Sequence, residues 1–158
     1  MPLKTEVLLR YANGYRILGM FEDAEEELAK IPPEELEHDH ALTLKLALFQ
    51  DSEKWDSMQE VASLLRERHP DNSDWWIAEA FATRRCRSLD EARKVLLEGE
   101  GIHPEEPCLL FNLGCYACVS GDLEEALLRV RTAIALDPKY RALALEDEDL
   151  LLLRDELR

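Results

Sequence analysis

Proline recurs at a fixed interval along this chain. Pro70, Pro104 and Pro138 are each separated by 34 residues, and each follows a histidine or an aspartate. A period of this length is typical of repeat proteins, in which each repeat is one supersecondary unit that buries its apolar face by stacking on its neighbours. The sequence therefore predicts a stack of similar units rather than a fold around one central core.

The same register holds further columns of small or apolar residues. They are Ala24, Met58, Ala92 and Ala126; Ala12, Leu46, Ala80 and Gly114; Ile31, Leu65, Gly99 and Ala133; and Phe21, Trp55, Leu89 and Leu123. A short break divides each unit in two, which is typical of two antiparallel helices joined by a tight turn. We expect an all-α fold with repeats at about 5–38, 39–72, 73–106 and 107–140.

Local signals place the helices within these units. Residues 88–91 and 122–125 resemble capping boxes at helix starts, Gly19 and Gly121 suit left-handed helix ends, and Pro32 with the next proline ends a helix and can open another. The expected helices are near 3–18, 21–31, 39–50, 54–68, 73–85, 89–101, 107–119, 122–136 and 140–156.

The last segment, 141–158, departs from the repeat. It combines several leucines with the acidic run Glu146–Asp149. Because a stack of repeats must cover its final apolar face, we interpret this segment as a capping helix. Whether that helix caps the stack or lies in its groove stays open at this stage.

Composition limits the possible partners. The 158 residues (18.2 kDa) fit one domain spanning 1–158. Acidic residues outnumber basic ones by 34 to 19, and the net charge of −15 repels phosphate, so neither nucleic acid nor an anionic membrane surface is expected. From the charged start of the chain we expect no signal peptide, and from the lack of a long apolar stretch we expect no membrane insertion. We expect a cytoplasmic protein whose four cysteines are reduced.

The motifs of these units resemble the tetratricopeptide repeat (TPR). The fourth unit matches the TPR pattern most fully, with Leu110, Asn112–Gly114, Gly121–Asp122, Glu125–Ala126, Ala133 and Leu136–Pro138. The resemblance covers about four periods of 34 residues. It implies a right-handed superhelical α-solenoid whose concave groove, lined by the first helix of each unit, binds peptides or protein domains without catalysis.

That resemblance also indicates which residues face the groove. The expected partner-binding residues are Leu9, Asn13, Arg16, Thr43, Ala47, Ile77, Phe81, Arg84, Arg85, Phe111, Asn112 and Cys115. Apolar anchors beside arginines suit an apolar ligand with acidic flanks, because such residues dominate the energetics of protein interfaces. The alternative, that Phe81 and Phe111 simply pack between neighbouring helices, is equally compatible with the pattern.

Other candidate chemistry has simpler explanations. Cys115 and Cys118 form one CxxC motif, with Cys108 on the same helical face, but a second pair is lacking, so we interpret them as small buried hydrophobic residues. The junction Glu37–His40 fits a solvated loop better than a metal site. The sequence has no phosphate-binding or catalytic motif. We therefore expect no metal, no cofactor and no enzymatic activity.

The function predicted from the sequence is binding of a peptide or protein segment in the groove, in an adaptor or assembly role. A first alternative is a dedicated cytosolic chaperone for a secreted or membrane protein. A lesser alternative is a metal or thiol-redox protein that uses the cysteine face. The expected partner is a protein or peptide, and the chain is expected to be a monomer or a weak homodimer.

Overall fold

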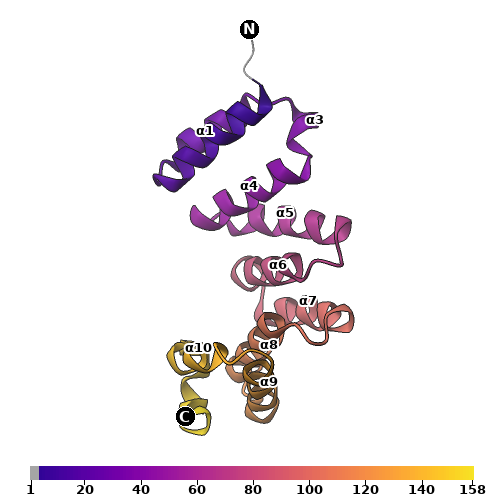
Figure 1. Cartoon of the computed structure of the whole chain (residues 1–158), viewed down its shortest axis with the longest axis vertical. Helices are drawn as coiled ribbons and strands as arrows, with labels where there is room; N and C mark the ends of the chain where they lie inside the picture. The colour runs from indigo at the N-terminus through magenta and orange to yellow at the C-terminus, as the bar shows by residue number, and fades with distance from the viewer. Residues whose placement is uncertain (1–3) are drawn as a thin grey trace.

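The computed structural model describes residues 4–158, and these form helices and turns stacked along one axis (Figure 1). The helices are α1 (Thr5–Ile17), α2 (Phe21–Ala29), α3 (Pro33–Leu36), α4 (Asp39–Asp51), α5 (Trp55–Arg68), α6 (Ser73–Cys86), α7 (Leu89–Ile102), α8 (Pro107–Val119), α9 (Leu123–Leu136), α10 (Tyr140–Glu146), the 3-10 helix η1 (Glu148–Leu153) and α11 (Arg154–Leu157). No helix among these residues is long and apolar enough to cross a membrane.

The helix positions predicted from the sequence are confirmed from the first unit to residue 136, with each described bound within two residues of its expectation. The predicted start at residue 3 lies outside the described residues. The break at Pro32 does open a further element, the single turn α3.

Turns between paired helices follow the predicted chemistry. Gly19 and Gly121 have φ angles of 74° and 90°, and Glu53, at the equivalent position of the second unit, is also left-handed with a φ of 58°. Ser88 caps α7 by accepting a hydrogen bond from the Glu91 amide at 3.1 Å. Asp122 caps α9 in the same way, by accepting a hydrogen bond from the Glu125 amide. The Glu125 side chain does not complete a capping box, because it accepts a hydrogen bond from Arg129.

The core is divided into three clusters along the stack. The first joins α1, α2 and the inner side of α4, the second joins α4 and α5 with part of α6, and the third extends from α6 to α11. The side chains of Ala24, Met58, Ala92 and Ala126, which are 34 residues apart, are at most 1% exposed. This position of the repeat therefore lies inside each helix pair. Helices α8 and α9 approach each other closely at Gly114, where an added Cβ would lie 2.6 Å from a methyl carbon of Val130.

The expectation of one helix over 140–156 is wrong. The chain leaves α10 at Asp147, which is extended (φ −71°, ψ 125°) and whose carboxylate accepts a hydrogen bond from the Asp149 amide at 2.9 Å. Aspartate favours such caps over helix interiors, and like charges three or four residues apart repel in a helix. The break directs Leu150 and Leu153 into the third cluster.

Because of this break at Asp147, the last helices turn back onto the preceding ones. We call Tyr140–Leu157 the C-terminal segment. Its helices α10 and α11 contact α9, which is the expected position for a cap, while η1 lies on α8. Figure 1 shows the segment, in yellow, folded back beside α8 and α9. The segment therefore both caps the stack and covers part of the groove face.

Candidate protein-binding groove

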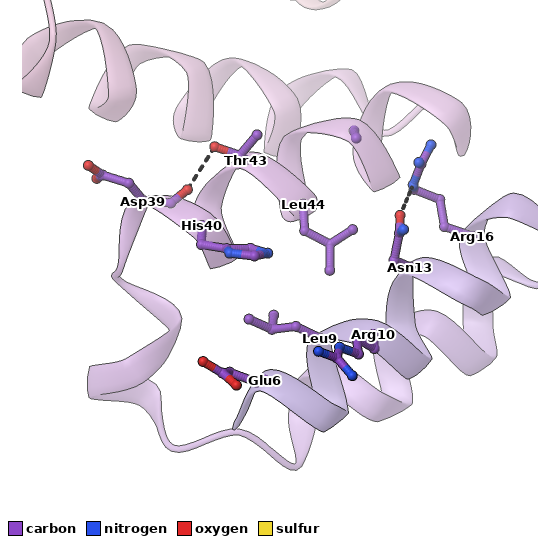
Figure 2. Close-up of a pocket in the computed structure, with 10 residues that line it drawn as sticks. Glu6, Leu9, Arg10, Asn13, Arg16, Asp39, His40, Thr43 and Leu44 are labelled. Atoms are coloured by element: carbon purple, nitrogen blue, oxygen red, sulfur yellow. Dashed lines mark hydrogen bonds between the residues drawn. The ribbon is translucent and has the colours of Figure 1, made fainter. Parts of the chain in front are cut away.

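An open depression lies between α1 and α4, with a volume of about 760 Å³ (Figure 2). It is lined by Glu6, Leu9, Arg10, Asn13, Arg16, Asp39, His40, Thr43, Leu44 and Ala47. Five of the groove residues predicted from the sequence, namely Leu9, Asn13, Arg16, Thr43 and Ala47, are therefore brought together here. We call this depression the α1–α4 groove.

The floor of the α1–α4 groove is apolar. Leu9 and Leu44 approach each other from the two helices (Figure 2), are 7% and 9% exposed, and belong to the first core cluster. An apolar side chain seated against them would leave water, at about 25 cal/mol for each Å² of apolar area buried. The floor is thus suited to anchor one hydrophobic side chain of a partner.

The walls of this groove are polar and already ordered. Asn13 accepts a hydrogen bond from the Arg16 Nε at 3.1 Å, and the same guanidinium forms an ion pair of 2.5 Å with Asp51. On the opposite wall the Thr43 hydroxyl donates to the carbonyl of Asp39 at 2.7 Å. These contacts hold the hydrogen-bonding side chains in place, which lowers the entropy cost of binding.

The junction predicted to be a solvated loop supplies the outer edge of the groove. The Asp39 carboxylate lies 2.6 Å from His69 Nε2 and 3.2 Å from an Arg68 nitrogen. The hydrogen bond to His69, followed by that to Arg68, lowers the pKa of Asp39. Asp39 therefore links the start of α4 to the end of α5, and His40 beside it lines the depression.

The predicted residues in the middle of the face form a stacked cluster. Phe81 meets the edge of Trp55 with ring centres 5.7 Å apart, and the Arg85 guanidinium lies 3.4 Å from the centre of the Phe81 ring. This burial lowers the pKa of Arg85. Ile77 is partly buried against the third cluster. Phe81 is only half-buried, so this cluster is accessible from one side.

The predicted residues Arg84 on α6 and Phe111 on α8 do not form open surface, because the C-terminal segment packs on them. Phe111 is buried, with its ring centre 5.1 Å from that of Tyr140. Arg84 donates two hydrogen bonds, of 2.5 and 2.9 Å, to the Asp149 carboxylate. Asn112 donates to the carbonyl at the start of its own helix. Phe111 is thus packed against a neighbouring element, as the alternative interpretation of the sequence allowed.

Sequence reasoning missed the residues that fill this half of the face. Tyr116 and Asp149 contact the predicted Arg84, whose guanidinium lies 5.1 Å from the centre of the Tyr116 ring, and Tyr140 contacts the predicted Phe111. The available signal was the acidic run Glu146–Asp149, opposite in charge to the arginines that end α6.

Cys115 of the CxxC motif lies beside two aspartates. Cys115 is buried, and its burial, together with the charges of Asp147 and Asp149, raises the pKa of the thiol. The three side chains bring one ligand atom each within 4.8 Å. However, a metal-bound thiol must lose its proton, and the Asp149 carboxylate is already neutralised by an arginine. At Cys115 this environment therefore opposes loss of the thiol proton.

These helix pairs, stacked with a 34-residue period, form an α-solenoid with a TPR-like fold, and the fold expected from the repeat motifs is confirmed. Among solved structures, the chain is similar to a thermophilic TPR protein from Thermus thermophilus. The TM-score is 0.69 at 21% identity, and the match covers 96% of this chain and 84% of that one. No protein-family model and no curated protein matches the sequence. The likeness is therefore one of fold.

Proposed function

We propose that this chain is a non-enzymatic protein-interaction module that binds a peptide or protein segment in the α1–α4 groove, in an adaptor or assembly role. The observation that carries the proposal is the open apolar floor formed by Leu9 and Leu44 between ordered polar walls. A concave, largely preformed surface with a few fixed polar groups is the usual form of a binding site. The solenoid fold supports the same role, because stacked repeats present extended concave surfaces.

The proposed ligand is a short segment with one apolar anchor. Its anchor contacts Leu9 and Leu44, and its flanking polar groups meet the walls of Asn13 and Thr43. Phe81 and Arg85, further along the face, extend the same surface and supply an aromatic and a cationic contact. We treat the chain as one domain, with the four repeats at 5–38, 39–72, 73–106 and 107–140 acting as a unit.

The test uses a library of displayed peptides selected against the unmodified protein, followed by measurement of Kd for the selected peptides. The decisive variant is Thr43→Arg, which places a long charged side chain in the groove. Because Thr43 is exposed, this change leaves the core intact. We expect a loss of affinity of about tenfold or more, as is typical when a contact at the centre of an interface is disrupted.

A matched control is Thr132→Arg. Thr132 is also exposed, also lies on a helix and also donates its hydroxyl hydrogen to the carbonyl four residues earlier, at 2.8 Å. Its position on α9 lies outside the α1–α4 groove. Equal affinities of the two variants for every selected peptide would contradict the proposal, as would a selection that yields no specific peptide.

A further inference from the structure

The C-terminal segment occupies the surface of α6 and α8 in the manner of a bound ligand. The Asp149 carboxylate receives two hydrogen bonds from Arg84, Tyr140 lies against Phe111, and Leu150 is fully buried. We call the surface beneath it the α6–α8 surface; it comprises Arg84, Phe111, Cys115 and Tyr116.

The chemistry of this contact is specific. A planar guanidinium with two parallel hydrogen bonds to one carboxylate is a strong and directional pair. Arginine is always charged in proteins, and the hydrogen bond to Asp149 further raises the pKa of Arg84. Next to this pair the surface accepts the leucines that follow the acidic run. The α6–α8 surface is thus complementary to acidic residues followed by leucines.

The structure of the segment depends on this surface. Its three elements are 7, 6 and 4 residues long, and isolated helices of that length are unstable in water. The middle element is a 3-10 helix, whose hydrogen bonds are poorer than those of an α-helix. Leu143, Leu151 and Leu152 remain 46%, 58% and 70% exposed. The contacts with α8, α9 and Arg84 therefore supply most of its order.

We propose that the α6–α8 surface is a second binding surface, for a partner segment in which acidic residues precede leucines, and that the C-terminal segment is an internal ligand that such a partner displaces. The internal ligand is tethered through the short turn 137–139, so its effective concentration is in the mM range. A partner gains access when it binds more tightly or when the internal contacts are weakened. This proposal is independent of the α1–α4 groove.

The test measures binding in trans of a fluorescent peptide with the sequence of residues 140–158, by anisotropy. The peptide is titrated against the unmodified protein and against Asp149→Arg, in which the internal ligand has lost its charged hydrogen bonds. Such bonds contribute about 1.5–3 kcal/mol, so we expect the variant to bind the peptide about tenfold more tightly than the unmodified protein does.

Asp155→Arg is the matched control. Asp155 lies in the same segment, its side chain is 88% exposed, and it pairs with Arg158. This variant should bind the peptide as weakly as the unmodified protein does. A peptide that itself carries Asp149→Arg should lose its affinity for the Asp149→Arg protein. Equal affinities across the three proteins, or full binding by the altered peptide, would overturn the proposal.

Hydrogen exchange on the unmodified protein decides the matter if Asp149→Arg fails to fold. A displaceable ligand opens without global unfolding. The amides of η1 and α11 should then exchange at least about tenfold faster than the slowest amides of α8 and α9. Exchange of both regions at one common rate would mean that the segment is a permanent part of the core, and the proposal would be wrong.

Discussion

The two halves of the groove face share one repeat register but differ in what covers them. Leu9, Thr43, Ile77 and Phe111 are each 34 residues apart. The first two line the open α1–α4 groove, whereas the last is buried beneath the C-terminal segment. The repeat pattern thus specifies the face on which a residue lies. A segment outside the repeat decides whether that residue is accessible.

The α1–α4 groove and the α6–α8 surface also differ in how much they contribute to the stability of the fold. The α1–α4 groove has a small apolar floor and polar walls held by exposed ion pairs, which contribute little to stability. The α6–α8 surface belongs to a cluster that extends over seven elements, from α6 to α11 with η1 included. We therefore expect substitutions in the second half to affect stability more than equivalent substitutions in the first.

The largest expected effect concerns the leucines of the C-terminal segment. Leu150→Ala removes a fully buried side chain and should lower the free energy of unfolding by about 2–5 kcal/mol. Leu151→Ala, at an exposed neighbouring position, should change it by less than about 0.5 kcal/mol. Urea denaturation measures both values. Similar values for the two variants would show that the segment does not contribute to the core.

The next contrast uses two glycines in helices that line the groove face. Gly114→Ala places a methyl group against Val130 and should cost about 1–3 kcal/mol. Gly14→Ala meets no atom within 4 Å and should stabilise α1 by about 1 kcal/mol, because alanine favours helix. Thermal unfolding of the two variants compares the halves directly. A stabilised Gly114→Ala protein would contradict the close packing of α8 on α9.

A smaller effect is expected at the turns that end α4 and α8. Glu53 adopts the left-handed conformation that Gly121 provides in the other half. Glu53→Gly should therefore raise the free energy of unfolding by about 0.5–1 kcal/mol, since the left-handed region is costly for side chains with a Cβ. Gly121→Ala should lower it by about 1 kcal/mol. Chemical denaturation tests whether the two turns respond in opposite directions.

The smallest effect is a dependence on pH at the edge of the α1–α4 groove. The pKa of Asp39 is lowered in the folded state, so its contribution to stability is complete above its unfolded pKa of about 3.9 and is lost as the pH falls through the folded value. Acidification below about pH 4 should lower the Tm of Asp39→Asn less than that of the unmodified protein. Asp71→Asn, at an exposed loop position, should behave like the unmodified protein.

Much of the fold could be predicted because the 34-residue register repeats. Each column places small residues where paired helices approach, and glycines or caps where helices end, so helix bounds followed from local chemistry. Gly114 and the left-handed Gly121 are examples in which residue type and geometry agree.

The C-terminal segment could not be predicted in the same way, because it has no counterpart in the repeat. Leucine content alone indicated a helix, whereas the helix ends at Asp147 and the chain turns to bury Leu150. The pairing of Arg84 with Asp149 joins residues 65 positions apart, and opposite charge alone does not specify such a contact. The predicted residues on α1 and α4 line an open depression, whereas Phe111 on α8 is covered by the C-terminal segment.

The division of the core into three clusters affects the order in which parts of the chain can fold during synthesis. A chain emerges from the ribosome with its N-terminus first, and folding can begin before synthesis is complete. The first two clusters contain no residue beyond Ala82. The third requires Leu150, Leu153 and Leu157. A nascent chain is therefore expected to present its arginine-bearing α6–α8 surface uncovered until these leucines have emerged.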